Sequence, residues 1–333
     1  MNTPRHSVSF LRYMVAVLLL TFGAALSTTA FAQSSPKTNE TVFRVGWQKG
    51  SHLALLKSLQ SLEKRLESSG VSVTWIEFTA GPQMLEGLNV GSIDFACVGE
   101  TPPVFAQAAG APLLYVANEP PAPEAEKVLV PKNSTLRSFG ELKGKRIVLN
   151  RGSNVHYLLL KLLAKENLKY SDVNVVYLPP ADARAAFENG SVDAWVIWDP
   201  FAEAAIVQTG ARVLAEAKAT PVNIAENYNF YLTTQAFAQQ HPEILKQTVD
   251  ELKKMGEWVP SHLDEAAALL APQIGLTPAI AKSSLSHYGY GVLHGFPIGA
   301  KVIANQQAIA DAFFEQKLIP KKLEVQSVVW KPF

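Results

Sequence analysis

The sequence predicts an α/β protein built as two lobes, each a mostly parallel sheet flanked by helices, with a cleft between them. The chain has 333 residues, of which 48% are hydrophobic, so it can bury one large core or two of medium size. Short apolar runs alternate with helical stretches, which is typical of parallel-sheet units. In addition, two sequence patterns each occur twice, in the same order.

The repeated patterns predict the two lobes. Residues 44–51 read as a strand followed by an amide, a cation, a glycine and a serine, and residues 146–153 repeat this pattern. Residues 91–102 and 190–200 share a Gly-Ser turn, an aspartate, an apolar run and an acidic residue near a proline. Gly-Ser turns are common in α/β proteins, but two pairs at nearly equal spacing argue against coincidence. Ligands bind beyond the carboxyl ends of strands in such sheets, so two facing edges predict one shared site.

The individual elements follow from apolar periodicity. A polar leader spans residues 33–40, and five leucines at helical spacing predict a helix over residues 53–66. From Pro242 onward the chain is predicted to be almost wholly helical. The predicted strands are residues 43–47, 73–78, 93–98, 113–117, 128–130, 146–149, 173–178, 194–197 and 230–232.

Two segments are expected to connect the lobes. The proline-rich strip over residues 119–131 is interpreted as the crossover to the second lobe, and residues 226–234 as the return. The helical C-terminal third would then pack back on the first lobe. We therefore expect the first lobe to comprise residues 33–125 and 232–333, and the second lobe to comprise residues 126–231.

The N-terminus resembles a secretory signal peptide over residues 1–32. Arg5 and Arg12 precede an apolar run over residues 13–26, and a small-x-small pattern ends at Ala32. The alternative is an uncleaved membrane anchor, but the run is shorter than the roughly 20 residues that a spanning helix needs. We expect cleavage after Ala32 and an exported, soluble, periplasmic protein.

Composition excludes several classes of function. Thirty basic residues against 29 acidic ones give a formal net charge of +1, so no nucleic-acid partner is expected. One cysteine excludes an intramolecular disulfide and any cysteine-rich metal or iron–sulfur site. Cys97 lies in an apolar run and is predicted to be buried in the core. We predict neither a metal nor a cofactor.

Several predicted helix starts have the chemistry of an anion site. Residues 50–51, 81–83 and 152–154 combine glycine with serine, asparagine, proline or glutamine, at points where backbone N–H groups are free. Each serine or asparagine could equally cap its own helix. As a set converging on one cleft, these residues favour anion binding. Gln48 and Asn150, at two strand ends, add neutral amide donors that bring no charge.

Two acidic residues occupy equivalent points of the two lobes. Glu100 and Asp199 suggest an acid–base pair, but each stands close before a proline, which is typical of a helix cap. We interpret Asp199 as a cap that also faces the ligand. The neighbouring Trp198 either packs against an apolar tail of the ligand or belongs to the core. His156 is placed near the cleft, where a structural role is the expected one.

Signatures of catalysis are absent from the sequence. It contains neither a Gly-x-Ser-x-Gly elbow nor a His-Glu-x-x-His motif, and residues 140–146 are one residue short of a phosphate-binding loop. No catalytic residue is predicted, and the protein is expected not to be an enzyme.

The most specific motifs resemble one family. Ala80-Gly81-Pro82-Gln83 and Trp198-Asp199-Pro200, together with segments 45–51, 89–94, 105–111, 180–187 and 192–200, closely resemble the aliphatic-sulfonate-binding periplasmic proteins of ABC importers. The likeness extends from about residue 43 to residue 330. It implies a type II solute-binding fold that closes on a sulfonate. It also implies a monomer that delivers this ligand to a membrane permease driven by a cytoplasmic ATPase, for sulfur acquisition.

The resemblance also implies a set of ligand-binding residues. The residues expected around the sulfonate head are Gln48, Gly81, Gln83, Gly152, Ser153 and Asn154. Those expected along the remaining pocket are Glu100, Thr101, Glu119, Trp198, Asp199 and Tyr228. The sequence departs from the family pattern at residues 100–101, 154–155 and 287–295. The resemblance therefore predicts the sulfonate head group of the ligand but not the size or chemistry of its organic tail.

Two alternatives remain at the level of sequence. One is a receptor for another small monoanion, such as taurine, nitrate or bicarbonate, because a lack of basic clusters does not separate monoanions. The other is an enzyme on the same architecture, similar to the synthases of a thiamine pyrimidine precursor. Those enzymes carry a cysteine-rich motif, whereas this chain has only Cys97.

Overall fold

The structure is a computed structural model that describes residues 41–290 and 298–331. The predicted signal peptide, its cleavage site and part of the loop after residue 290 lie outside the described residues. Within the described ranges, no helix combines the length and the apolar character needed to cross a membrane.

Ten strands form two five-stranded sheets with equivalent strand orders. In each sheet one strand runs antiparallel to its two neighbours, and the other pairings are parallel. The first sheet, in spatial order, contains β2 (Val71–Glu77), β1 (Thr41–Trp47), β3 (Phe95–Gly99), β10 (Asn229–Thr234) and β4 (Leu113–Asn118). The second contains β7 (Asn174–Tyr177), β6 (Arg146–Leu149), β8 (Ala194–Trp198), β5 (Glu126–Val130) and β9 (Arg212–Glu216).

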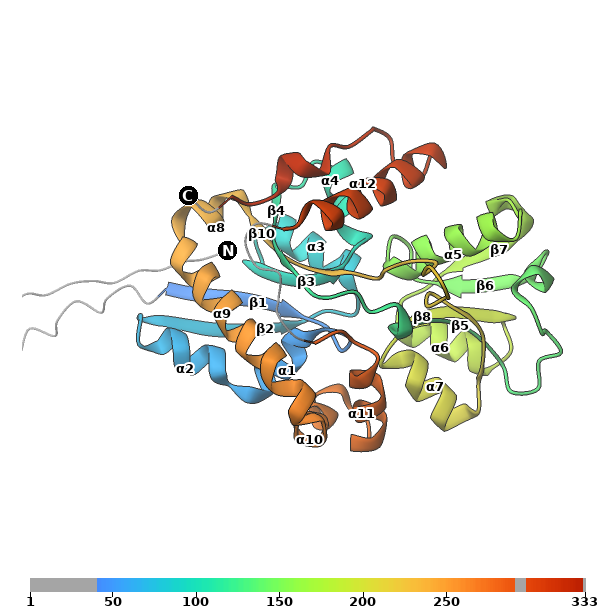
Figure 1. Cartoon of the computed structure of the whole chain (residues 1–333), viewed down its shortest axis with the longest axis horizontal. Helices are drawn as coiled ribbons and strands as arrows, with labels where there is room; N and C mark the ends of the chain where they lie inside the picture. The colour runs from blue at the N-terminus through green and yellow to red at the C-terminus, as the bar shows by residue number, and fades with distance from the viewer. Residues whose placement is uncertain (1–40, 291–297, 332–333) are drawn as a thin grey trace, which may run out of the picture. The chain divides into compact units, whose positions relative to one another are not determined.

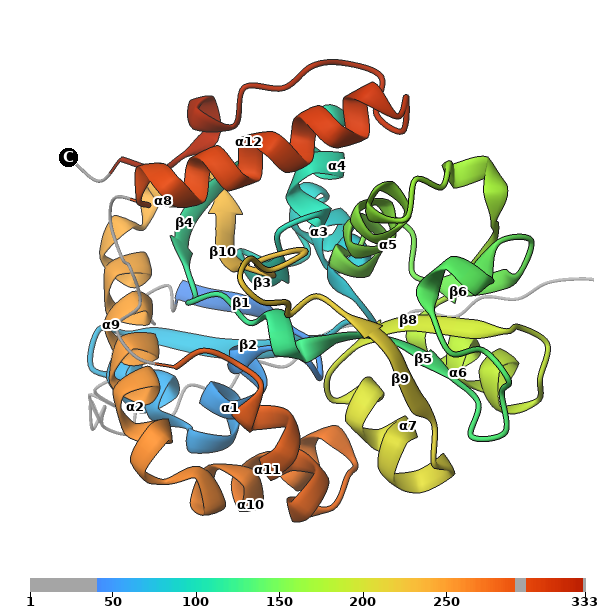
Figure 2. The same ribbon diagram turned by 45° about the vertical axis from the view of Figure 1, so that its right-hand side comes forward.

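Helices cover both sheets (Figures 1 and 2). Those before β5 and after β10 accompany the first sheet, and α5 to α7 accompany the second. The helices are α1 (His52–Leu59), α2 (Ser61–Glu67), α3 (Gly81–Asn89), α4 (Pro102–Ala108), α5 (Asn154–Lys165), α6 (Pro180–Glu188), α7 (Phe201–Thr209), α8 (Gln235–Gln240), α9 (Pro242–Trp258), α10 (Leu263–Ile274), α11 (Pro278–Ser286) and α12 (Ala300–Glu315). The two-lobed α/β fold predicted from the sequence is confirmed, whereas the predicted limits of the lobes stay a prediction.

The inner strands are buried on both faces, as expected for strands covered by helices on each side. All five residues of β3 and all five of β5 are buried. Cys97, in β3, is 1% exposed, which confirms the prediction that it belongs to the core. Phe313 of α12 packs edge-on against Phe105 of α4 and against His156 of α5, so α12 touches helices of both lobes (Figure 2).

The sequence repeat corresponds to repeated hydrogen bonds. In the first lobe the backbone N–H of Arg44 donates to the carboxylate of Asp94 at 2.8 Å, and the Asp94 N–H donates to the Arg44 carbonyl at 2.7 Å. In the second lobe Arg146 and Asp193 form the same two bonds at 2.7 and 2.8 Å. Asp94 thus ties the turn before β3 to β1, and Asp193 ties the turn before β8 to β6, which explains why the motif recurs.

Two sequence-based predictions need correction. The helix predicted over residues 53–66 is two helices, because Gln60 adopts a left-handed backbone with φ of 54° and ends α1. Leu62 and Leu66 remain buried in α2, so the leucine spacing survives the break. Strand β9 was not predicted. It pairs only with β5 at the sheet edge and is partly exposed, which weakens its apolar pattern.

Candidate functional site

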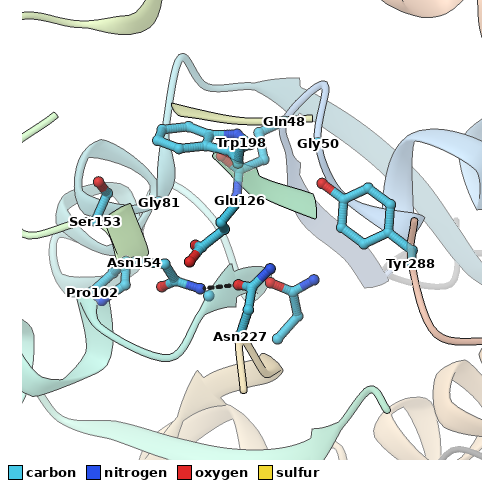
Figure 3. Close-up of a pocket in the computed structure, with 12 residues that line it drawn as sticks. Gln48, Gly50, Gly81, Pro102, Glu126, Ser153, Asn154, Trp198, Asn227 and Tyr288 are labelled. Carbon is cyan, nitrogen blue, oxygen red and sulfur yellow. Dashed lines mark hydrogen bonds between the residues drawn. The ribbon is translucent and has the colours of Figure 1, made fainter. Parts of the chain in front are cut away.

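A pocket lies where the carboxyl ends of strands from both sheets meet (Figure 3). Its free volume is about 370 Å³, including the open solvent at its mouth. Residues from both lobes and from the segments that connect them contribute. The lining residues are Gln48, Gly50, Gly81, Gly99, Pro102, Glu126, Ser153, Asn154, Trp198, Asn227, Asn229 and Tyr288. They include no lysine or arginine, so hydrogen bonds from amides, hydroxyls and backbone groups must recognise an anion here.

Three helices begin at this pocket, and one of them is α4, which starts at Pro102. Helix α5 starts at Asn154 after Ser153, and α3 starts at Gly81. Neither N-terminus is capped by a side chain of the preceding residue, so capping does not consume their first-turn donors. The Ser153 hydroxyl instead donates to the Asn150 carbonyl at 2.7 Å. This geometry favours the anion interpretation over the capping one for α5.

His156 holds the turn before α5. Its Nδ1 accepts a hydrogen bond from the Gly152 N–H at 3.3 Å, and its Nε2 contacts the Tyr170 hydroxyl at 3.0 Å. Burial lowers the pKa of His156 to about 4, assisted by the nearby charge of Arg151. A neutral ring accepts at Nδ1 while it donates at Nε2, so His156 has the structural role predicted for it.

Asn154 connects the two lobes directly. Its Oδ1 accepts from the backbone N–H of Thr101 at 3.0 Å, and its Nδ2 donates to Asn227 Oδ1 at 2.6 Å. A Cβ at Gly99 would overlap this side chain, so Gly99 is required by the close approach of the lobes. The structure therefore shows the lobes joined across the pocket, with Asn154 as the bridging residue.

Glu100 is fully buried beneath the pocket. Its Oε2 accepts from the Tyr228 N–H at 3.0 Å and from the Asn305 amide at 3.2 Å, and its Oε1 has no partner among the described residues. Burial raises the pKa of Glu100 to about 7, because neutral donors only partly offset the loss of water.

Asp199, at the equivalent point of the second lobe, lies beside a lysine and a histidine. Its carboxylate lies 3.4 Å from Lys127 Nζ and 2.6 Å from His287 Nδ1. It also accepts from the Glu203 N–H at 2.9 Å, in the first turn of α7, although the N-cap residue of that helix is Pro200. Asp199, Glu203 and His287 are close enough to hold a metal ion, but the Lys127 ammonium beside Asp199 disfavours a second cation.

Glu119 and His52 form a second buried pair, next to the crossover between the lobes. Glu119 Oε1 lies 2.9 Å from His52 Nδ1 and accepts from the Tyr231 hydroxyl at 2.6 Å. Burial raises the pKa of Glu119, but the charge and hydrogen bond of His52 and further hydrogen bonds outweigh it, so the net shift is downward. This pair anchors the end of β4 and lies behind the pocket wall.

The comparisons with known proteins point to one family. The sequence matches the family described as NMT1/THI5 like over residues 66–266. It is 41% identical, over 95% of this chain and 97% of the relative, to a protein of Escherichia coli strain K12 named for binding aliphatic sulfonates. The chain belongs to the family of aliphatic sulfonate-binding proteins.

Solved structures of that family have the same fold. The alkanesulfonate-binding protein SsuA from Xanthomonas axonopodis pv. citri, bound to MOPS, is 41% identical, and the match covers 88% of this chain and 99% of that one with a TM-score of 0.81. The Escherichia coli sulfonate-binding protein SsuA gives a TM-score of 0.77 at 41% identity, with 88% and 92% covered. A desulfurization enzyme also shares the fold, at only 16% identity and a TM-score of 0.64.

Five of the residues that the resemblance to the sulfonate-binding family implied line the pocket, and the others do not. The lining ones are Gln48, Gly81, Ser153, Asn154 and Trp198. The ones outside the lining are Gln83, Glu100, Thr101, Glu119, Gly152, Asp199 and Tyr228. Glu100 accepts from Tyr228, which lies between two lining residues, and the Thr101 N–H donates directly to the lining residue Asn154. The Gly152 N–H donates to His156. No ligand contact tests the set, so the assignment of roles stays a prediction.

The sequence did not single out four polar or aromatic lining residues, namely Glu126, Asn227, Asn229 and Tyr288. The first three belong to the segments that were recognised as lobe connections, and Tyr288 follows α11. A connection between two lobes must pass beside the cleft, so its polar residues were available as candidates from the sequence. The position of Tyr288 depends on how the C-terminal helices pack, which the sequence did not indicate.

Proposed function

We propose that this protein is a periplasmic receptor that captures alkanesulfonates and delivers them to an ABC permease powered by a cytoplasmic ATPase. The observation that carries the proposal is the pocket. It is formed by both lobes, is flanked by two uncapped helix N-termini and has no cationic side chain in its lining. Such a site suits a monoanion that must later be released. Family membership specifies a sulfonate, and a relative with 41% identity has been solved with the sulfonate MOPS.

Within this proposal the N-terminal 32 residues act as a cleaved export signal, and the exported protein works as a monomer. Its activity is binding rather than catalysis, in keeping with relatives that are named as sulfonate-binding proteins. Closure of the lobes around the ligand would present the loaded surface to the permease. The Asn154 bridge shows how closely the two lobes can approach.

Titration of the protein purified from the periplasm with methane-, butane- and octanesulfonate tests the proposal. Trp198 lines the pocket, so its fluorescence should report binding, and the melting temperature provides a second readout. A ligand present at 100 times its Kd stabilises the folded state by about 2.7 kcal/mol, which is easily measured. A response to nitrate or bicarbonate, with none to any sulfonate, would overturn the proposed ligand class.

A further inference from the structure

Glu126 places an unsatisfied carboxyl group in the pocket. Its side chain is 1% exposed, and neither carboxylate oxygen has a hydrogen-bond partner among the described residues. Figure 3 shows the carboxyl group pointing inward, toward the amide side chains of Asn154 and Asn227. A buried carboxylate without a partner is costly, so this group must stay protonated or pair with a cation.

The groups around Glu126 do not provide that cation. Lys127 is the next residue, but its ammonium lies beside Asp199 and the Glu124 carbonyl. Glu100, from the end of β3, adds repulsion. Burial and the charge of Glu100 raise the pKa of Glu126 well above its usual value, and the Asn154 amide and Lys127 offset this only partly. These surroundings favour the neutral acid form of Glu126 whenever no cation is paired with it.

The equivalent position in the first lobe is satisfied. Glu126 is the first residue of β5 and pairs with Trp198 of β8, whereas Asn229 is the first residue of β10 and pairs with Gly99 of β3. Both Glu126 and Asn229 line the pocket, but the Asn229 amide donates to Glu119 at 2.8 Å. The unmatched carboxyl group is thus specific to one side of the pocket.

We propose that the pocket takes sulfonates that also carry a protonated amine, with the ammonium group paired to Glu126. This inference rests on the proposed function, because it refines the ligand class of the same pocket. The helix N-termini and neutral donors receive the sulfonate, and Glu126 receives the opposite end of the dipolar ligand. Trp198 and Tyr288 line the same pocket and offer aromatic faces that attract an organic cation.

A proton balance follows from this assignment. The ammonium enters with its own proton and stays charged, while Glu126 passes from carboxylic acid to carboxylate. The acid proton leaves to solvent, so binding of an aminosulfonate releases up to one proton. An alkanesulfonate without an amine leaves Glu126 protonated and releases none at this site.

An isosteric pair of ligands tests the inference. 3-Aminopropanesulfonate and butanesulfonate differ by an ammonium in place of a terminal methyl group. We expect the wild-type protein to bind the amine at least ten-fold more tightly than butanesulfonate, and Glu126→Gln to bring the ratio of the two affinities close to one. Calorimetry in phosphate and in Tris, neither of which is a sulfonate, measures the released proton. Glu77→Gln, at an exposed carboxyl group on β2 outside the pocket lining, is the charge-matched control.

The outcomes separate this inference from the proposed function. Equal or tighter binding of butanesulfonate by the wild type overturns the role of Glu126 but leaves the sulfonate receptor standing. An amine preference that persists in Glu126→Gln also overturns it, because another group must then hold the ammonium. Failure of both ligands to bind contradicts the receptor proposal itself.

Discussion

The two lobes place an acidic residue at the same point and give it opposite surroundings. Glu100 follows β3 and Asp199 follows β8, each the central strand of its sheet. Asp199 lies beside Lys127 and His287, whereas Glu100 receives only neutral donors and has a pKa raised to about 7. The comparison teaches that topology fixes where a carboxyl group lies, while its neighbours decide whether it is charged.

The largest expected difference between the two lobes is in the free energy of unfolding when Asp199 or Glu100 is replaced by its amide. Asp199→Asn leaves Lys127 without its buried partner and should lower the free energy of unfolding by about 3–5 kcal/mol. Glu100→Gln, measured at pH 7.5 as the matched variant, should be neutral or stabilising, because Glu100 has no cationic partner. Urea unfolding of both variants provides the test. Equal destabilisation by the two substitutions would contradict the comparison.

The raised pKa of Glu100 should also be detectable in the pH dependence of the free energy of unfolding. Its pKa rises from 4.5 to about 7 on folding, so its stabilising contribution is fully present below pH 4.5 and is lost as the pH rises through 7. The shift corresponds to on the order of 3 kcal/mol. Urea titrations at pH 5 and pH 7.5 should show a smaller decline for Glu100→Gln than for the wild type. Parallel declines would rule out a raised pKa at this site.

The two lobes also differ at the last residue of the central strand. This residue is Gly99 in the first lobe and Trp198 in the second. A methyl group at Gly99 would collide with the bridging Asn154 side chain, so Gly99→Ala should oppose lobe closure. Overpacking typically costs about 1–3 kcal/mol, which corresponds to a loss of ligand affinity of roughly 5- to 150-fold. Gly299→Ala, where a Cβ meets nothing within 4 Å, is the control. Unchanged affinity of Gly99→Ala would show that closure does not require this contact.

The smallest difference concerns the repeated Arg–Asp pairs. The Arg44 side chain contacts Asp94 through two nitrogens, at 2.5 and 2.9 Å, whereas the bonds described between Arg146 and Asp193 involve only the backbone of Arg146. The Arg44 side chain is 39% exposed, so solvent screens this pair. Arg44→Ala should cost about 1 kcal/mol, and Arg146→Ala less than about 0.5 kcal/mol. Thermal unfolding measures the loss of stability in both variants. A larger loss for Arg146→Ala than for Arg44→Ala would contradict the stronger role given to the Arg44 side chain.

Most of the fold could be predicted because the same sequence motifs occur in both halves of the chain. The paired motifs at residues 44–51 and 146–153 marked the two lobes, and apolar runs marked most strands within two residues of their ends. Gln60 and β9 were missed for local reasons. A left-handed residue leaves no trace in apolar spacing, and an edge strand with partial exposure lacks a clear pattern.

The site could be predicted only in part. Gln48 and Ser153 belong to motifs at strand ends, so their position follows from the fold. Glu126 lies in a lobe connection, and its importance depends on partners it lacks, which only the packed structure shows. Tyr288 lines the pocket although it lies in the C-terminal part of the chain, and no local sequence pattern predicts such a long-range contact.

The placement of β10 has a consequence for how the chain acquires its structure. The second sheet uses one continuous stretch, from Glu126 to Glu216, and can be completed as soon as that stretch is available. The first sheet must leave β3 and β4 unpaired along one edge until Asn229–Thr234 has been synthesised, after the whole of the other sheet. Exposed edges of this kind invite wrong pairing. The lobe that begins first is therefore finished last, and a chain that ends before Asn229 would carry an open, association-prone sheet.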